Sequence, residues 1–287
     1  MGRFYDIHAR KPGYEDWWTR AITLEETIEA GMVSREWAEA RKRQWGEDSS
    51  IYQQRVLGEF AADEESAIIS LALVEAANER WRAWVEAGQP PSKGKRVLGV
   101  DVARYGADKS CIAERIGGVL VSLDKWSKRD TMETAGRVKA VLGSDVAHVD
   151  VIGIGAGVVD RLRELHCNVV GVNFGAGANR KDASGEVEML NVRAAAWWGM
   201  RERLMEGVIA FPPDDELVGD LVAPRYGYTS AGKLKVESKE QIRTRLGHSP
   251  DVGDAVVLAW WEPRRQGSFD GVPQAETERS RWRIGHD

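Results

Sequence analysis

The chain has 287 residues, enough for one large domain or two smaller ones, and its 43% hydrophobic and 30% charged residues are typical of a globular protein. Its formal net charge of −5 excludes a uniformly basic protein that coats nucleic acid, although a local basic face would suffice to contact phosphates. The absence of a bilayer-length apolar run and of an apolar N-terminal signal region predicts a cytoplasmic protein without membrane contact. The two cysteines, Cys111 and Cys167, are predicted to be reduced core residues.

The N-terminal third of the sequence is polar and helical in character. An exposed helix of mixed charge is predicted over residues 36–45, and a second helix over residues 66–87, where apolar residues recur near helical spacing. Paired prolines flanked by glycines in residues 88–95 then mark a boundary. We therefore expect a helical N-terminal segment (1–90), a globular domain (91–263) and a flexible polar tail (264–287).

Strands and helices alternate after this boundary. Three strands come first, the last two joined by the hairpin signal Ile116-Gly-Gly118, and strand–helix–strand steps follow, which imply parallel strands with right-handed crossovers. The sequence thus predicts an α/β fold: a mixed sheet of three antiparallel strands followed by parallel strands, flanked by helices. The expected elements are strands 96–103, 110–115, 118–123, 148–152, 168–174 and 208–211, helices 131–142, 157–165, 188–206, 217–223, 239–246 and 251–261, and a hairpin over 225–237.

Aspartates stand where two of the predicted strands end. Asp101 closes the run Arg96-Val-Leu-Gly-Val-Asp101, and Asp150 lies in Ala147-His-Val-Asp150-Val-Ile. A carboxylate at the end of a buried strand is costly unless something pairs with it. Converging carboxylates form a set of hard oxygen ligands suited to Mg²⁺ or Mn²⁺. Capping of the glycine-containing turn that follows is the alternative role for Asp101.

A third acidic element lies far downstream in Ser249-Pro-Asp251-Val-Gly-Asp254. Proline favours a helix start, and acids three residues apart share one helix face. Helix capping explains Asp251 but not a second acid on the same face of an apolar helix. Asp101, Asp150, Asp251 and Asp254 are therefore the candidate catalytic and metal-binding residues, and two-metal phosphodiester hydrolysis is the chemistry that they suggest.

Other polar motifs around these acids are less specific. Gly153, Gly155 and Gly157 follow Asp150, but their spacing departs from the dinucleotide-binding pattern G-x-G-x-x-G, which argues against a nucleotide site. Several basic residues are candidates for contacts with DNA phosphates, with solvated helix faces and a loop histidine as the alternative. They are Lys109, Lys181, Lys239, Arg243, Arg245 and His248.

Taken together, these stretches resemble the C-terminal nuclease domain of tailed-phage large terminase subunits, which has an RNase H/RuvC-like fold. The stretches that carry the resemblance are 100–110, 149–157, 191–197 and 237–255, and residues 50–60 look like the segment that joins the ATPase and nuclease domains of the family. The resemblance implies a metal-binding triad of Asp101, Asp150 and Asp251, with Asp254 as support or as a fourth ligand. It further implies two Mg²⁺ or Mn²⁺ ions about 4 Å apart, and cleavage of concatemeric double-stranded DNA in a bacterial host cell.

The sequence departs from the family pattern in one respect: it lacks the signature motif of the ATPase domain, the motor that drives DNA packaging in the family. The sequence contains no G-x-x-x-x-G-K-[ST] motif, so we expect no ATP hydrolysis by this chain. A split gene product or a prophage remnant would fit, with a separate packaging ATPase, a small terminase subunit and the portal as the implied partners. The alternatives are a RuvC-like junction resolvase with the same acids, a packaging-complex docking module with an idle site, and an actin-like ATPase, whose second phosphate loop and adenosine-binding glycines are not evident.

Overall fold

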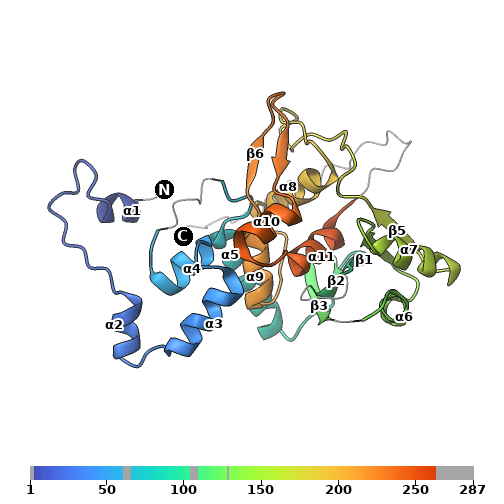
Figure 1. Ribbon diagram of the computed structural model, residues 1–287, viewed down its shortest axis with the longest axis horizontal. Coiled ribbons are helices and arrows are strands. Elements are labelled where there is room, and N and C mark those ends of the chain that lie inside the picture. The colour runs from blue at the N-terminus through green and yellow to red at the C-terminus, as the bar shows by residue number, and fades with distance from the viewer. Residues whose placement is uncertain (1–2, 61–65, 104–108, 128, 263–287) are drawn as a thin grey trace, which may run out of the picture.

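The computed structural model describes residues 3–60, 66–103, 109–127 and 129–262. Its centre is a five-stranded sheet with strand order β3-β2-β1-β4-β5 (Figure 1). The strands are β1 (Arg96–Asp101), β2 (Ser110–Ile116), β3 (Val119–Trp126), β4 (Val146–Asp150), β5 (Val169–Val172), β6 (Tyr226–Tyr228) and β7 (Leu234–Val236). The helices are α1 (Arg3–His8), α2 (Leu24–Glu29), α3 (Arg35–Trp45), α4 (Ser50–Tyr52) with the π-helical turn η1 (Gln53–Leu57), α5 (Leu71–Glu86), α6 (Thr131–Leu142), α7 (Gly155–Glu164), α8 (Val192–Met205), α9 (Asp215–Val222), α10 (Lys239–Leu246) and α11 (Asp251–Trp260).

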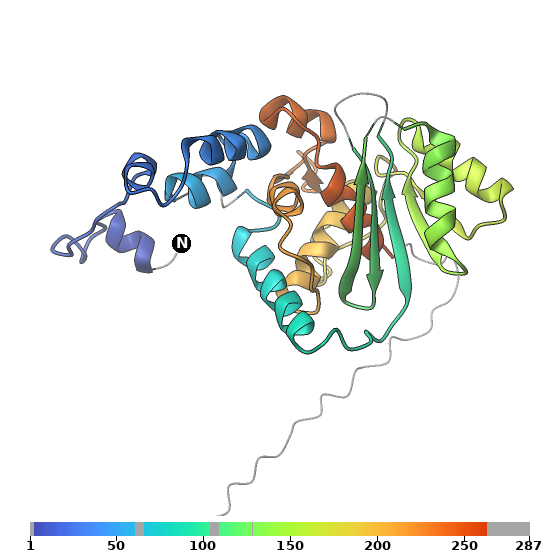
Figure 2. The same cartoon turned by 90° about the horizontal axis from the view of Figure 1, so that it is seen from below.

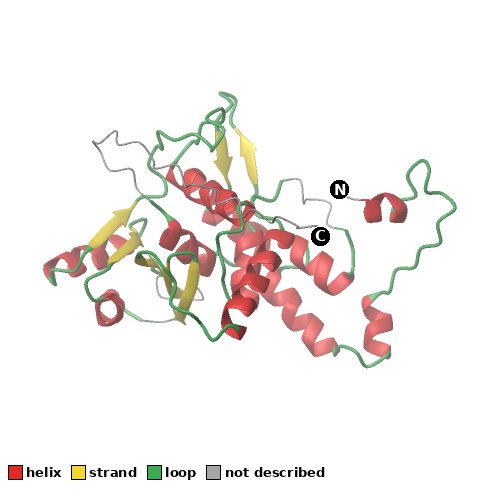
Figure 3. Ribbon diagram, turned by 180° about the vertical axis from the view of Figure 1, so that it is seen from behind, coloured by secondary structure: helices red, strands yellow, loops and turns green. Residues whose placement is uncertain are grey.

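The sheet has the predicted mixed topology. Strands β1, β2 and β3 pair antiparallel, whereas β4 pairs parallel with both β1 and β5. Strands β6 and β7 form a separate antiparallel hairpin that stands apart from the main sheet (Figure 3). The predicted α/β class and the order of three antiparallel strands followed by parallel strands are therefore confirmed.

Helices cover both faces of the sheet, as Figure 2 shows. On one face, Leu98 and Val100 of β1 share a buried cluster with α6 and α7. Because side chains alternate along a strand, Gly99 and Asp101 point to the other face, which α11 covers. The same alternation in β4 places Asp150 on the α11 side. Both strand-end aspartates thus face one helix.

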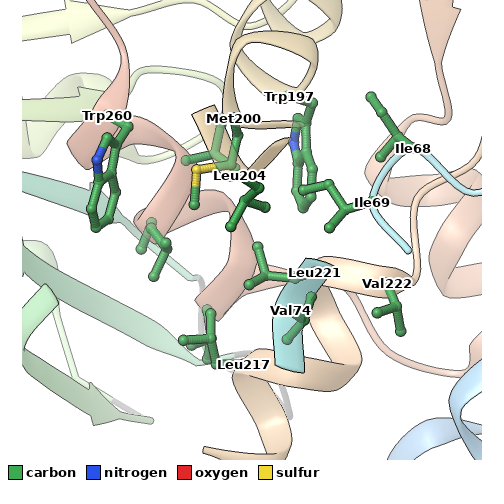
Figure 4. Close-up of a cluster of buried hydrophobic side chains, with 14 of the residues drawn as sticks. Ile68, Ile69, Val74, Trp197, Met200, Leu204, Leu217, Leu221, Val222 and Trp260 are labelled. Carbon is green, nitrogen blue, oxygen red and sulfur yellow. The ribbon is translucent and has the colours of Figure 1, made fainter. Parts of the chain in front are cut away.

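Helix α11 is the core element of that second layer. All ten of its residues are buried, including its two aspartates, and a helix that is apolar on every side belongs in a protein core. Figure 4 shows the apolar cluster beside it. Trp260 of α11, Trp197 of α8, Leu217 of α9 and Val74 of α5 belong to this single buried cluster.

Most of the N-terminal segment shares this core. Ala38 and Trp45 of α3 are buried, so the helix predicted over residues 36–45 is only partly exposed. Trp45 packs against Gly219 of α9, and its Nε1 donates to the carbonyl of Asp215 at 2.9 Å. Helices α1 and α2, in contrast, have no buried residue. The division of the chain near residue 90 stays a prediction, and the predicted tail 264–287 lies outside the described residues. Within those residues, every helix is too short or too polar to cross a membrane.

The differences from the predicted elements are largest at three places, where tertiary contacts override local patterns. Helix α8 begins at Val192, not at residue 188, because the Asn191 side chain caps it by accepting the Ala194 N–H, and residues before it pair with other segments. Helix α5 begins at Leu71, not at residue 66. Residues 208–211 form no named strand, and only Ala210 makes an isolated parallel bridge to β3.

Substitution of Gly99 tests the close packing of α11 on β1. A Cβ atom at Gly99 would lie 2.0 Å from the carbonyl oxygen of Ala255 and 2.3 Å from the backbone nitrogen of Ala259, and backbone atoms cannot rotate away. We expect Gly99→Ala to lower the free energy of unfolding by more than about 3 kcal/mol. The control is Gly136→Ala in α6, where no atom lies within 4 Å and helix propensity predicts a gain of about 0.5–1 kcal/mol. Equal effects in urea unfolding would contradict the proposed packing.

Candidate active site

Two of the candidate acids lie at the ends of neighbouring parallel strands. Val100 pairs with Val149, so Asp101 and Asp150 follow side by side at the carboxyl edge of the sheet. The N-terminus of α11 brings Asp251 and Asp254 to the same place. All four are buried, with exposed fractions of 2% for Asp101 and 0% for Asp254. The structure thus joins residues that lie up to 153 positions apart in the sequence.

A single lysine lies among these four carboxylates. The Nζ atom of Lys239 is 2.7 Å from Asp101 Oδ1 and 3.3 Å from Asp254 Oδ2. It is also 3.8 Å from Asp251 Oδ1 and 3.9 Å from Asp150 Oδ2. Lys239 is the first residue of α10, whose N-cap forms a capping box that fixes the helix start. One ammonium group therefore offsets part of the charge of four acids.

Burial and the remaining repulsion among the carboxylates change the pKa values of the acids. Burial raises the pKa of Asp101, against the opposing effect of Lys239. Burial and the charge of Asp101 raise the pKa of Asp251 to about 7, and burial raises that of Asp150 to about 6. Burial would lower the pKa of Lys239, but the surrounding carboxylates outweigh it and raise the pKa. The charge of Lys239 is therefore not enough to neutralise the four carboxylates, and a further cation would stabilise them.

Asp254 differs from the other three acids because it has dedicated partners. Arg193 Nη1 donates to both of its oxygens, at 2.7 and 2.9 Å, and Trp197 Nε1 donates to Oδ1 at 2.8 Å. Burial opposes ionisation, but Arg193 and Lys239 prevail and lower the pKa of Asp254. Sequence reasoning missed Arg193 as a site residue, although an arginine in the alanine-rich stretch 191–197 was an available signal.

Helix α11 is held at both ends by side chains from other elements. At its start, Asp220 of α9 accepts the backbone N–H groups of Val252 at 2.9 Å and Gly253 at 3.1 Å, in place of a local cap. At its end, His148 Nδ1 donates to the carbonyl of Leu258, and Arg115 donates to that of Ala259. Sequence reasoning missed Asp220, whose only signal was an acid inside an apolar helix.

Two of the predicted DNA-contacting residues lie next to Asp251. The backbone N–H of Lys109 donates to Asp251 Oδ2 at 3.1 Å, and Lys109 Nζ pairs with Glu216 at 2.8 Å. His248 Nδ1 lies 3.8 Å from Asp220 Oδ1. Lys109 and His248 line one cavity with Asp251, of about 270 Å³.

The other predicted basic residues are placed differently. Lys239 lies within the carboxylate cluster itself. Arg245 pairs with Glu237 at 2.6 Å and donates to the carbonyl of Ala223, so it holds α10 in place. Arg243 is exposed on α10, and Lys181 lines a different cavity.

The donor set of the cluster fits a hard divalent cation. Carboxylate oxygens are the ligands that Mg²⁺ and Mn²⁺ prefer, and the ammonium group among them shows that the position attracts a cation. In the part of the chain that the structure describes, no group of three or more His, Cys, Asp or Glu side chains is arranged as a metal site. Lys239 Nζ lies in the space among the carboxylates, so metal binding would require Lys239 to move.

The chain is similar to a terminase large subunit and to solved terminase nuclease domains. No protein-family model matches the chain. The probable terminase large subunit of Enterobacteria phage P7 is 25% identical over 90% of the chain, which spans about half (54%) of the length of that relative. The nuclease domain of the large terminase subunit gp2 of bacterial virus Sf6 matches with a TM-score of 0.58 and 21% identity, over 69% of this chain and all of that one. A mutant of the same domain, solved with manganese and β-thujaplicinol, matches with a TM-score of 0.59.

This chain has the fold of a terminase nuclease domain. The resemblance seen in the sequence is thus confirmed at the level of the fold, and the mixed sheet is that of RNase H-like terminase nucleases. Within this terminase-type fold, the carboxylate cluster lies where β1, β4 and α11 meet.

The repulsion in the cluster predicts a pH dependence of stability. A raised pKa means that folded Asp251 keeps a proton that the unfolded chain has released, so its contribution to stability is lost as the pH rises from about 4 to about 7. In EDTA, Asp251→Asn should therefore gain stability relative to wild type over this range, reaching roughly 4 kcal/mol at pH 8. Urea unfolding at several pH values measures the difference. The exposed Asp160→Asn on α7 is the control, and a constant difference for Asp251→Asn would contradict the assignment.

Proposed function

We propose that this chain is the nuclease part of a phage terminase large subunit and cleaves double-stranded DNA with the help of divalent metal ions. The observation that carries the proposal is the convergence of Asp101, Asp150, Asp251 and Asp254 within 4 Å of one ammonium nitrogen. The fold and the similarity to a probable terminase large subunit support it. The manganese in the similar viral domain supports the choice of metal.

Asp101, Asp150 and Asp251 are the residues that we assign to hold Mg²⁺ or Mn²⁺. When bound, these ions would lower the pKa of an attacking water and offset charge on the phosphate. The pKa values of Asp150 and Asp251 lie near neutrality, so cation binding at neutral pH would release protons from these carboxyl groups.

Asp254 serves in this proposal as a supporting residue. Its two oxygens already accept hydrogen bonds from Arg193, which also donates from Nε to the carbonyl of Glu237 at 2.9 Å. Glu237 lies two residues before Lys239, so Arg193 ties α11 to the start of α10. Asp254 and Arg193 thereby fix the position of Asp251 relative to Lys239.

Lys239 holds the acids together while no metal is bound. Removal of a partner from a buried charged pair is strongly destabilising, and Lys239 prevents four buried carboxylates from facing one another uncompensated. Its side chain is 27% exposed and can swing toward solvent, whereas Asp101 is fixed on a central strand. Displaced in this way, the ammonium group would be free to contact a DNA phosphate.

Terminase partners belong to the same proposal. A DNA-packaging ATPase, a small terminase subunit and a portal would act with this chain in a bacterial host cell. The relative from phage P7 is about twice as long as the matched region, so its further functions are not assigned to this chain.

Cleavage of plasmid DNA tests the proposed function. Wild type should nick and linearise the plasmid with Mn²⁺ or Mg²⁺ but not with EDTA. Asp101→Asn should reduce the rate by more than about 100-fold, because loss of a residue that only hydrogen-bonds to a metal ligand already costs up to about that much. Asp160→Asn, an exposed acid on α7, should cleave as wild type does.

Two outcomes would contradict the proposal. A folded wild-type chain that cleaves with neither metal would point to a docking module with an idle site. Cleavage of four-way junctions but not of linear duplexes, measured in parallel, would favour a junction resolvase instead.

A further inference from the structure

A polar cavity of about 270 Å³ adjoins the carboxylate cluster and has Asp251 in its wall. Four separate parts of the chain build it: helix α3 of the N-terminal segment, Lys109 just before β2, helix α9, and the residues around the start of α11. The lining residues that the argument uses are Arg43, Lys109, Glu216, Asp220, His248 and Asp251.

Helix α3 presents Arg43 to this cavity from a fixed position. Trp45 is buried, its Nε1 donates to the carbonyl of Asp215, and Arg41 pairs with the Asp215 carboxylate at 3.0 Å. The indole of Trp45 also fills the space above Gly219 of α9. Arg43 therefore belongs to the same rigid body as the acids, although it lies 208 positions before Asp251 in the sequence.

Among the charged residues that line the cavity, Arg43 has no close carboxylate partner within the described residues. Glu216 pairs with Lys109 at 2.8 Å and with Lys125 at 3.1 Å, so its charge is offset. Burial raises the pKa of Asp220 well above its ordinary value and so favours the neutral acid. Arg43 is exposed on α3, and no carboxylate of the described residues lies within 4 Å of its guanidinium group.

We propose that this cavity is a phosphate subsite of the nuclease, in which Arg43 binds a backbone phosphate of the DNA strand that reaches Asp251. Lys109 and His248 also line it. A guanidinium group donates two parallel hydrogen bonds to phosphate oxygens, and such a contact positions the strand without reading its sequence. The proposal rests on the proposed nuclease function. It adds that the N-terminal segment forms part of the DNA-binding surface.

Three variants on one helix test the subsite. Arg43→Gln removes the guanidinium group, and Arg43→Lys keeps a positive charge without the two parallel N–H donors. Lys42→Gln is the control, because Lys42 is adjacent in the sequence but pairs with Glu47 and does not line the cavity. Cleavage kinetics give KM and kcat for a duplex substrate with Mn²⁺. Fluorescence anisotropy of a labelled duplex, with each variant combined with Asp101→Asn to prevent cleavage, gives Kd as a function of salt.

We expect Arg43→Gln to raise KM and Kd about five- to tenfold with kcat within twofold of wild type. The slope of log Kd against log salt concentration should fall by about one, which corresponds to the loss of one phosphate contact. Arg43→Lys should recover part of the affinity, and Lys42→Gln should stay within twofold of wild type. Wild-type cleavage combined with equal behaviour of Arg43→Gln and Lys42→Gln would overturn the subsite alone. A folded wild type that neither binds nor cleaves DNA would overturn the proposed function as well.

Discussion

The burial of four carboxylates at one point is the constraint on which the rest of this structure depends. Like charges taken out of water repel, and the fold offsets them with two cations of different kinds. Arg193 is bound to Asp254 by two hydrogen bonds and serves as a permanent partner. Lys239 is a single flexible side chain shared among all four acids. The cluster therefore has one counter-charge held by two hydrogen bonds and one that the proposed metal binding would displace.

The scaffold around this cluster is rigid where the acids are attached. Gly99 lets α11 lie directly on the central strand, and Asp220, His148 and Arg115 hold the two ends of that helix. These contacts join the sheet, α9 and α11 into one unit, so the relative positions of Asp101 and Asp251 are set by packing and not by loops. The N-terminal segment extends this unit, because Trp45 packs on α9 and places α3 beside the same site. Close packing thus offsets an electrostatic cost. The packed strands and helices hold the acids close together although their negative charges repel one another.

The sequence predicts those parts of the site that rest on local signals. Asp101 and Asp150 end apolar strands, and Asp251 opens an apolar helix after a proline, so their placement follows from short patterns. The alternation of strands and helices similarly predicts the mixed sheet. The roles of Arg193 and Asp220 could not be assigned in this way, because they depend on partners 61 and 32 residues away. Lys239 was predicted to contact DNA, yet its neighbour Asp101 lies 138 residues earlier, and only the fold brings the two together. The observed start of α8 differs from the predicted start for the same reason, since the residues before it form hydrogen bonds with distant backbone segments.

We propose that the four-carboxylate cluster binds divalent metal ions by displacing Lys239, and anomalous diffraction from crystals soaked in Mn²⁺ tests this most directly. We expect anomalous density for manganese in contact with Asp101, Asp150 and Asp251. The Lys239 side chain should turn away from the cluster, while Asp254 keeps its hydrogen bonds to Arg193. Crystals at pH 8 are suitable, because the pKa values of Asp150 and Asp251 then favour the ionised carboxylates. Manganese density elsewhere in the molecule, with Lys239 still seated among the four acids, would contradict the account.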